Sequence, residues 1–182
     1  MILYFAFLLG VTSSNTLATG PRSVVAKFCE TYLKQTQETG LLEGDDRRRL
    51  APLLSRRLLR LLDDAAACQQ DWSRQQPKGS TDKPPFVDCC LFSSSVDWFP
   101  NPFRIGPAKK LPDGRYEITV MYRYKTKVQD HRWRDAFMVK KERGRYVIDD
   151  FVGDINAAAP EKPFLLSHEF RDCRDGRWGG VN

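Results

Sequence analysis

The stretch GRYEITVMYRYKTKVQDHRWRDAFMVKKERGRYVIDDFVGD, residues 114–154, decides the fold of this chain. Its first part alternates strictly between apolar and polar side chains, which is typical of a strand with one buried face and one face in water. Arg123 and Lys125 share the parity that we expect to face solvent. The opposite parity, which we expect to face the core, holds Tyr116, Ile118, Val120, Tyr122, Tyr124 and Val128.

Two turns divide this stretch into three strands. The polar break at 129–132 is short enough for a hairpin. Gly144 can adopt the positive φ that the second turn needs. We therefore predict an antiparallel meander with strands near 115–128, 133–141 and 145–152.

Two helices are predicted before the sheet. Val25, Phe28 and Tyr32 share one helical stripe, which predicts a helix near 23–39. A charge-rich turn follows, and Pro52 then suits the first turn of a second helix near 51–72, which carries a leucine stripe. The predicted fold is α+β, with two N-terminal helices packed on a curved antiparallel sheet.

The N-terminus has the features of an export signal. Residues 2–11 form an uncharged apolar run, too short to span a bilayer, and Ala18 offers a cleavage point. We expect residues 1–18 to be a signal peptide; the alternative is a buried N-terminal strand. The expected product is a periplasmic or secreted protein with no transmembrane segment, one domain at 19–154, and a linker and docked tail at 155–182.

Five cysteines bear on this expectation, because bridges are common outside the cytoplasm. Cys29 falls on the apolar helical stripe and is predicted to be a buried free thiol. We expect Cys68 to pair with Cys89 or Cys90, and Cys173 to pair with the other of these two. Both bridges would involve the proline-rich loop at 75–106, which we expect to be irregular. We also expect this loop to form an aromatic lid over the domain, with Trp98 and Phe99 as partner-binding residues.

Metal and catalytic signatures are weak. Adjacent cysteines lack the spacer of a zinc knuckle, and the two histidines, His131 and His168, are expected at the surface. Asp149 and Asp150 are the weak catalytic candidates. Neighbours on a strand point to opposite faces, so we do not expect them to share a proton. A strand-end aspartate that binds backbone amides is the commoner arrangement.

Four segments carry a resemblance to a known family. They are VVAKFCETYL (24–33), LAPLLSRRLLRLL (50–62), DWFPNPF (97–103) and FMVKKERGRYVIDDF (137–151). Over about 24–154 the chain resembles an uncharacterised family of exported bacterial domains with the nuclear transport factor 2-like, or cystatin-like, cone fold. The resemblance implies a cone-shaped interior, in which enzymes of this superfamily use a single inward aspartate as a general base. The chain differs from the usual members in its cysteine-containing loop, its lack of a lipid signal and its extra tail.

Charge suggests the partner. The formal net charge is +6 and residues 1–18 carry none of it, so the domain is basic and attracts anions. Solubility alone is the simpler explanation of this charge. We expect a non-enzymatic binding domain of the bacterial cell envelope, an immunity or envelope-assembly accessory protein, that uses Arg123 and Lys125. Its partner would be a protein or an anionic lipid head group; we expect no nucleic acid, metal or cofactor. The alternative is a small-molecule isomerase or hydrolase that uses the cone-shaped pocket.

Overall fold

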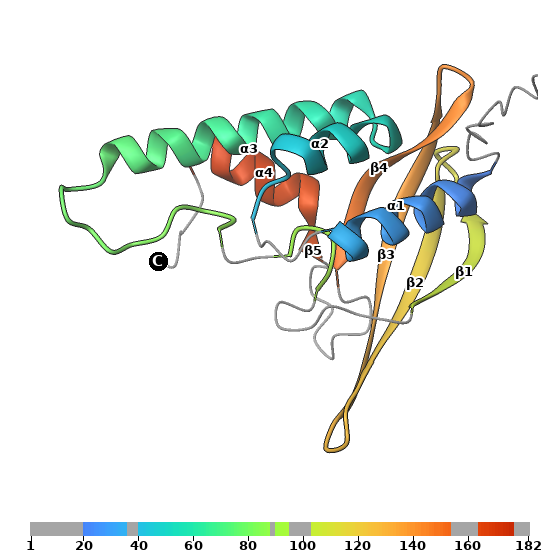
Figure 1. The fold of residues 1–182 in the computed structure, drawn as a ribbon. Coiled ribbons are helices and arrows are strands. Elements are labelled where there is room, and N and C mark those ends of the chain that lie inside the picture. Colours follow the sequence, from blue (N-terminus) through green and yellow to red (C-terminus); the bar gives the residue numbers. More distant parts are fainter. Residues whose placement is uncertain (1–19, 36–39, 88–89, 95–102, 154–163, 177–182) are drawn as a thin grey trace, which may run out of the picture.

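The computed structural model describes residues 20–35, 40–87, 90–94, 103–153 and 164–176 (Figure 1). The helices are α1 (Pro21–Gln35), α2 (Gly44–Leu50), the 3-10 helix η1 (Ala51–Leu53), α3 (Arg56–Gln75) and α4 (Leu166–Arg174). The strands are β1 (Phe103–Lys110), β2 (Tyr116–Lys125), β3 (Asp130–Glu142), β4 (Arg145–Gly153) and the two-residue β5 (Phe164–Leu165). The α+β prediction is confirmed.

The strands form one antiparallel sheet in the order β1-β2-β3-β4-β5. Four of them are long, and the helices gather to one side of the sheet (Figure 1). The β2–β3 hairpin extends well beyond the helices, at the bottom of this view. The outer part of this hairpin is therefore not covered by the helical layer.

The predicted register of the central strands is confirmed. Tyr122 is 3% exposed and pairs with Trp133, while Ile118 pairs with Phe137, so these side chains lie on the core face. The prediction for Val128 is wrong, because β2 ends at Lys125 and Val128 is 89% exposed. Thr126 closes the turn there: its hydroxyl oxygen accepts hydrogen bonds from the N–H groups of Val128 and Gln129.

The second predicted helix, near 51–72, is in fact two elements, η1 and α3, and a further helix, α2, precedes them. The expected charge-rich turn contains α2, whose first turn is acidic and whose last turn is basic, an order that suits the helix dipole. Pro52 lies in η1, not in the long helix. Ser55 then caps α3, because its hydroxyl oxygen accepts a hydrogen bond from the N–H of Leu58 at 3.0 Å.

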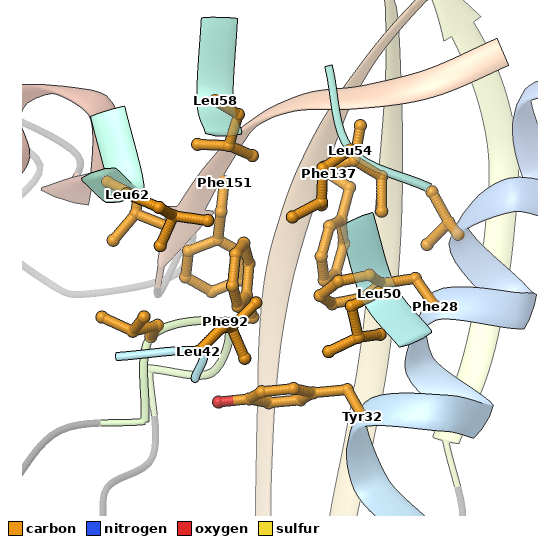
Figure 2. Packing of buried hydrophobic residues seen from close by; sticks show 14 of the residues in the cluster. Phe28, Tyr32, Leu42, Leu50, Leu54, Leu58, Leu62, Phe92, Phe137 and Phe151 are labelled. Carbon is orange, nitrogen blue, oxygen red and sulfur yellow. The ribbon is translucent and has the colours of Figure 1, made fainter. Parts of the chain in front are cut away.

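An aromatic core joins the helices to the sheet (Figure 2). Phe28 of α1 lies 4.9 Å, between ring centroids, from Phe92 and 5.6 Å from Phe137 of β3. Phe137 in turn lies 5.3 Å from Phe151 of β4. Leu58 and Leu62 of α3 pack into the same cluster. The predicted stripes on both helices are therefore the buried ones.

The last part of the predicted irregular loop and the tail both contain elements that were not predicted. Strand β1 begins at Phe103, inside the region expected to be irregular. Its pairing with β2 shifts at Gly106-Pro107, and an edge strand tolerates proline at such a bulge. Past the predicted linker, the tail forms β5 and α4, and α4 packs against α3.

One disulfide docks the tail. Cys68 of α3 is bonded to Cys173 of α4, across 105 positions of sequence. The prediction that each pairs with Cys89 or Cys90 is therefore wrong, because the two helices lie side by side and bring Cys68 and Cys173 together first. Cys90 is buried, and Cys89 lies outside the described residues. Docking of the tail through its cysteine is confirmed.

Residues 1–19 and 154–163 lie outside the described part of the chain, so the signal peptide and the linker stay predictions. In the described ranges, no helix is both long enough and apolar enough to cross a bilayer.

Candidate functional site

The outer face of the sheet, opposite the aromatic core, carries a concentration of arginine. Because strand side chains alternate, the residues between Val120, Tyr122 and Tyr124 point away from the core. Met121 pairs with Arg134, and Arg123 pairs with Arg132. Strand β1 adds Arg104, which pairs with Met121 on its other side. Three strands thus place four arginines around one methionine.

These side chains line a hollow of about 470 Å³, which we call the arginine groove. Its lining residues are Arg104, Met121, Tyr122, Arg123, Arg132, Trp133 and Arg134. Met121 is 38% exposed, which is unusual in this chain for a large apolar side chain. The volume is within the range of about 300–1,000 Å³ that small-ligand sites occupy.

One carboxylate outside the lining, that of Asp130, contacts two of the groove arginines. Arg123 donates two hydrogen bonds to Asp130, from Nε at 2.7 Å and from Nη2 at 2.6 Å. Arg132 donates a weaker one to the same aspartate at 3.4 Å. These bonds, those from Arg123 above all, lower the pKa of Asp130 well below its usual range. Among the described residues no acidic side chain pairs with Arg104, so positive charge remains in excess.

The predicted binding residues are only partly brought together. Arg123 lines the groove. Lys125 lies at the exposed end of β2, outside the lining, where it pairs across the strands with Asp130. Trp98 and Phe99 lie outside the described residues. Sequence reasoning missed Arg104, because the strand that carries it was read as loop, and it placed Arg132 in a turn.

The two catalytic candidates belong to a different constellation. The β3–β4 register shifts between Met138 and Val139, so β4 carries an extra residue at Asp149. Such a bulge breaks the alternation of side chains. Arg57 consequently reaches both carboxylates, through Nη2 at 3.2 Å from Asp149 Oδ2 and 3.2 Å from Asp150 Oδ2. Sequence reasoning did not foresee the bulge, so it did not predict that one arginine contacts both carboxylates.

Each aspartate has further partners. The Lys140 ammonium lies 2.8 Å from Asp149, and the Ser55 hydroxyl donates to Asp149 at 2.7 Å. Burial raises the pKa of Asp149, but the hydrogen bonds from Lys140, Ser55 and Arg57 outweigh burial and leave the pKa below its ordinary value. Asp150 accepts hydrogen bonds from the N–H groups of Phe151 and Ser167. The expected strand-end aspartate bound to backbone amides is therefore present at Asp150.

A third acidic residue faces the core, and sequence reasoning did not single it out. Asp135 is fully buried, and its carboxylate accepts hydrogen bonds from the N–H and the hydroxyl of Ser94. It interrupts the apolar parity of β3, between Trp133 and Phe137, and this interruption was the available signal. Trp133 has a buried indole N–H with no hydrogen-bond partner among the described residues.

The remaining nucleophile and metal candidates do not form a catalytic group. Burial raises the pKa of the Cys29 thiol to about 12, although a contact with the Tyr122 hydroxyl at 3.9 Å opposes the rise. His131 and His168 are both exposed, as predicted, and His131 stacks on Trp133. The described residues contain no group of three His, Cys, Asp or Glu side chains that could hold a metal ion.

No protein-family model, curated protein or solved structure matches this chain. No family is therefore identified, and what is established is the α+β architecture with its open antiparallel sheet and its one disulfide among the described residues.

Proposed function

We propose that this chain is an exported, non-enzymatic binding domain of the bacterial cell envelope, and that its arginine groove holds an anionic partner. The observation that carries the proposal is the placement of four arginines on one sheet face. Arg123 and Arg132 lie directly across from each other on neighbouring strands. Like charges in such pairs destabilise a sheet. Asp130 offsets part of that cost and a bound anion would offset more, whereas solubility needs no such clustering.

Two features support export. The Cys68–Cys173 disulfide is of a kind that persists in oxidising compartments, such as the periplasm or the extracellular medium. The uncharged apolar run at 2–11 has the length of a signal-peptide core. A periplasmic or secreted location is part of this proposal, as is the cone-shaped, cystatin-like form of the domain.

The enzyme alternative has one specific observation in its favour, which is the fully buried, core-facing Asp135. A general base needs access to substrate and an oriented partner. Ser94 donates two hydrogen bonds to the Asp135 carboxylate, one from its backbone N–H and one from its hydroxyl. Asp149 and Asp150 are held by Arg57. These contacts favour structural roles for all three carboxylates and support the binding proposal over the enzyme.

The test compares two double variants in the capture of partners from a cell-envelope extract. The groove variant is Arg104→Glu with Arg132→Glu. The control is Arg60→Glu with Lys110→Glu, two exposed cations on α3 and at the end of β1. Both lower the net charge equally, so only position differs. We expect capture to be lost in the groove variant and kept in the control.

Equal capture by the two variants would contradict the proposal. Loss of bound metabolite or of turnover in Asp135→Asn, with capture intact, would favour the enzyme instead. A neighbouring gene for an effector toxin would favour the immunity role over the envelope-assembly role.

A further inference from the structure

We infer that the arginine groove recognises phosphate, and that its ligand is a compact anion with at least two phosphate groups. This inference rests on the proposed function and names the chemistry of the partner. It follows from three properties of the groove, namely the kind of cation, the carboxylate already present, and the spacing of the side chains.

The cations that line the groove are all arginines. The lysines of the same three strands lie toward the strand ends, outside the lining; they are Lys109, Lys110, Lys125, Lys140 and Lys141. The planar guanidinium offers two parallel N–H donors that fit two oxygens of a phosphate or a carboxylate. A site that needed only positive charge could use either residue. The arginines therefore indicate a ligand whose oxygens accept bidentate hydrogen bonds.

The presence of Asp130 favours a phosphate ligand over a carboxylate ligand. Asp130 already occupies the forks of Arg123 and, more weakly, Arg132. A carboxylate ligand would replace one singly charged group by another, with little net gain. A phosphomonoester carries a charge of about −1.5 to −2 at neutral pH and three acceptor oxygens. Phosphate therefore competes with Asp130 where a carboxylate does not.

The spacing indicates more than one phosphate. Arg104 and Arg134 flank Met121 in one row across the sheet, separated by two strand spacings, or about 10 Å. Arg123 and Arg132 form the next row, about 7 Å along the strands. One phosphate cannot occupy all four guanidinium forks, because its three terminal oxygens make only three pairs, so a ligand that engages both rows fully carries at least two phosphates. Met121, exposed between the arginines, would contact the carbon part that joins two phosphate groups.

The experiment uses isothermal titration calorimetry on the full-length protein as it is purified. The probe is inorganic pyrophosphate, and citrate at equal ionic strength is the carboxylate comparator. We expect pyrophosphate to bind at least about tenfold more tightly than citrate. In the groove variant Arg104→Glu/Arg132→Glu we expect at least about a tenfold loss, because a hydrogen bond to a charged group contributes about 1.5–3 kcal/mol. Arg60→Glu/Lys110→Glu should bind within about twofold of wild type, since its changes lie outside the groove.

Arg132→Gln is the second variant. It keeps a polar side chain while removing the charge, so its weakened binding tests the site even where the double reversal fails to fold. Near-ultraviolet circular dichroism checks the fold of each variant.

Vesicles distinguish the two sources of phosphate. Phosphatidylcholine vesicles are compared with and without cardiolipin, whose head group carries two phosphates, in a flotation assay. Groove-dependent binding to cardiolipin identifies a lipid head group, and groove-dependent binding to pyrophosphate alone identifies a soluble phosphate; either result supports the inference. The inference is overturned if citrate binds as tightly as pyrophosphate, or if the groove variant still binds pyrophosphate as the wild type does. A protein captured through the groove and not displaced by pyrophosphate would overturn the phosphate assignment and leave the proposed function standing.

Discussion

Arg57 is the residue on which the junction of α3, β4 and α4 depends. It contacts two carboxylates that are only 5% and 4% exposed, Asp149 and Asp150. Burying a carboxylate is unfavourable unless it is paired and hydrogen-bonded. Here both conditions are met, because Ser55, Lys140 and two backbone N–H groups supply the remaining donors. The cluster therefore joins α3, β3, β4 and α4.

Replacing Asp149 by Asn tests that role. We expect Asp149→Asn to lower the free energy of unfolding by about 2 kcal/mol at pH 7, because it leaves Arg57 and Lys140 with one charge partner fewer. This is less than the 3–5 kcal/mol of a fully buried pair, since Arg57 is 35% exposed. Urea denaturation measures the change. Asp63→Asn, which breaks an exposed pair with Arg47, is the control and should cost under about 1 kcal/mol.

The effect should depend on pH with a definite sign. The folded state lowers the pKa of Asp149 below the ordinary 3.8, so its contribution to stability is present above that pH and is lost as the pH falls through the folded-state value. The difference between wild type and Asp149→Asn should therefore shrink below about pH 4. A difference that stayed constant down to pH 3 would exclude the charge as its cause.

Cys29 gives a second prediction at the level of single residues. Its thiol is buried, and burial raises its pKa to about 12, so almost no thiolate forms at neutral or mildly alkaline pH. We expect Cys29 to resist iodoacetamide in the folded protein at pH 8 and to react fully in guanidinium chloride. Mass spectrometry after each treatment locates the label. Rapid labelling of Cys29 in the folded protein would contradict the packing of α1 against β2.

Among the elements, those with a clear sequence period were predictable. Strands β2 and β3 alternate over much of their length, β4 follows the turn at Gly144, and α1 and α3 carry apolar stripes that the core buries. Strand β1 was missed because Gly106-Pro107 interrupts its pattern, and α2 because its side chains are mostly charged. The bulge at Asp149 has no sequence period at all. Pairing with β3 creates it, so only tertiary structure reveals that two adjacent aspartates share one arginine.

The Cys68–Cys173 disulfide should dominate the docking of α4. The chain-entropy model assigns a cross-link that closes a loop of about 100 residues roughly 4.7 kcal/mol. We expect Cys68→Ser to lower the free energy of unfolding by about 2–5 kcal/mol. Cys173→Ser should cost a similar amount, and the double variant little more than either single one, because all three remove the same bond.

Thermal denaturation with and without reductant measures these effects. Reductant should destabilise the wild type and leave the serine variants unchanged. The helix packing around the bond also includes the ring contact between Phe86 and Phe170, at 5.2 Å. Two cysteine variants whose losses simply add would show that each serine disturbs this packing independently of the disulfide.

At the scale of the whole molecule, strand pairing concentrates a charge that is scattered in the sequence. The central alternation predicted a basic sheet face with Arg123 on it. It could not predict the groove, because Arg104 and Arg132 come from segments read as loop and turn, and only the register places them beside Met121. A modest net charge of +6 thereby becomes a local excess on one face.

Asp130 partly neutralises this local positive charge. Its removal should lower the stability of the protein and strengthen its binding of phosphate. It is the carboxylate that bridges Arg123 and Arg132, which otherwise face each other as like charges. We expect Asp130→Asn to lower the free energy of unfolding at low salt, because the two arginines then face each other as unscreened like charges. At 1 M salt the loss should largely vanish, because the screening length falls to about 3 Å.

The same variant, Asp130→Asn, should bind pyrophosphate more tightly, because the carboxylate that competes for the arginines is gone. Asp71→Asn breaks an exposed pair with Arg74 on α3 and is the matched control, with no expected effect on binding. Weaker pyrophosphate binding by Asp130→Asn would mean that Asp130 orients the arginines for the ligand instead of competing with it.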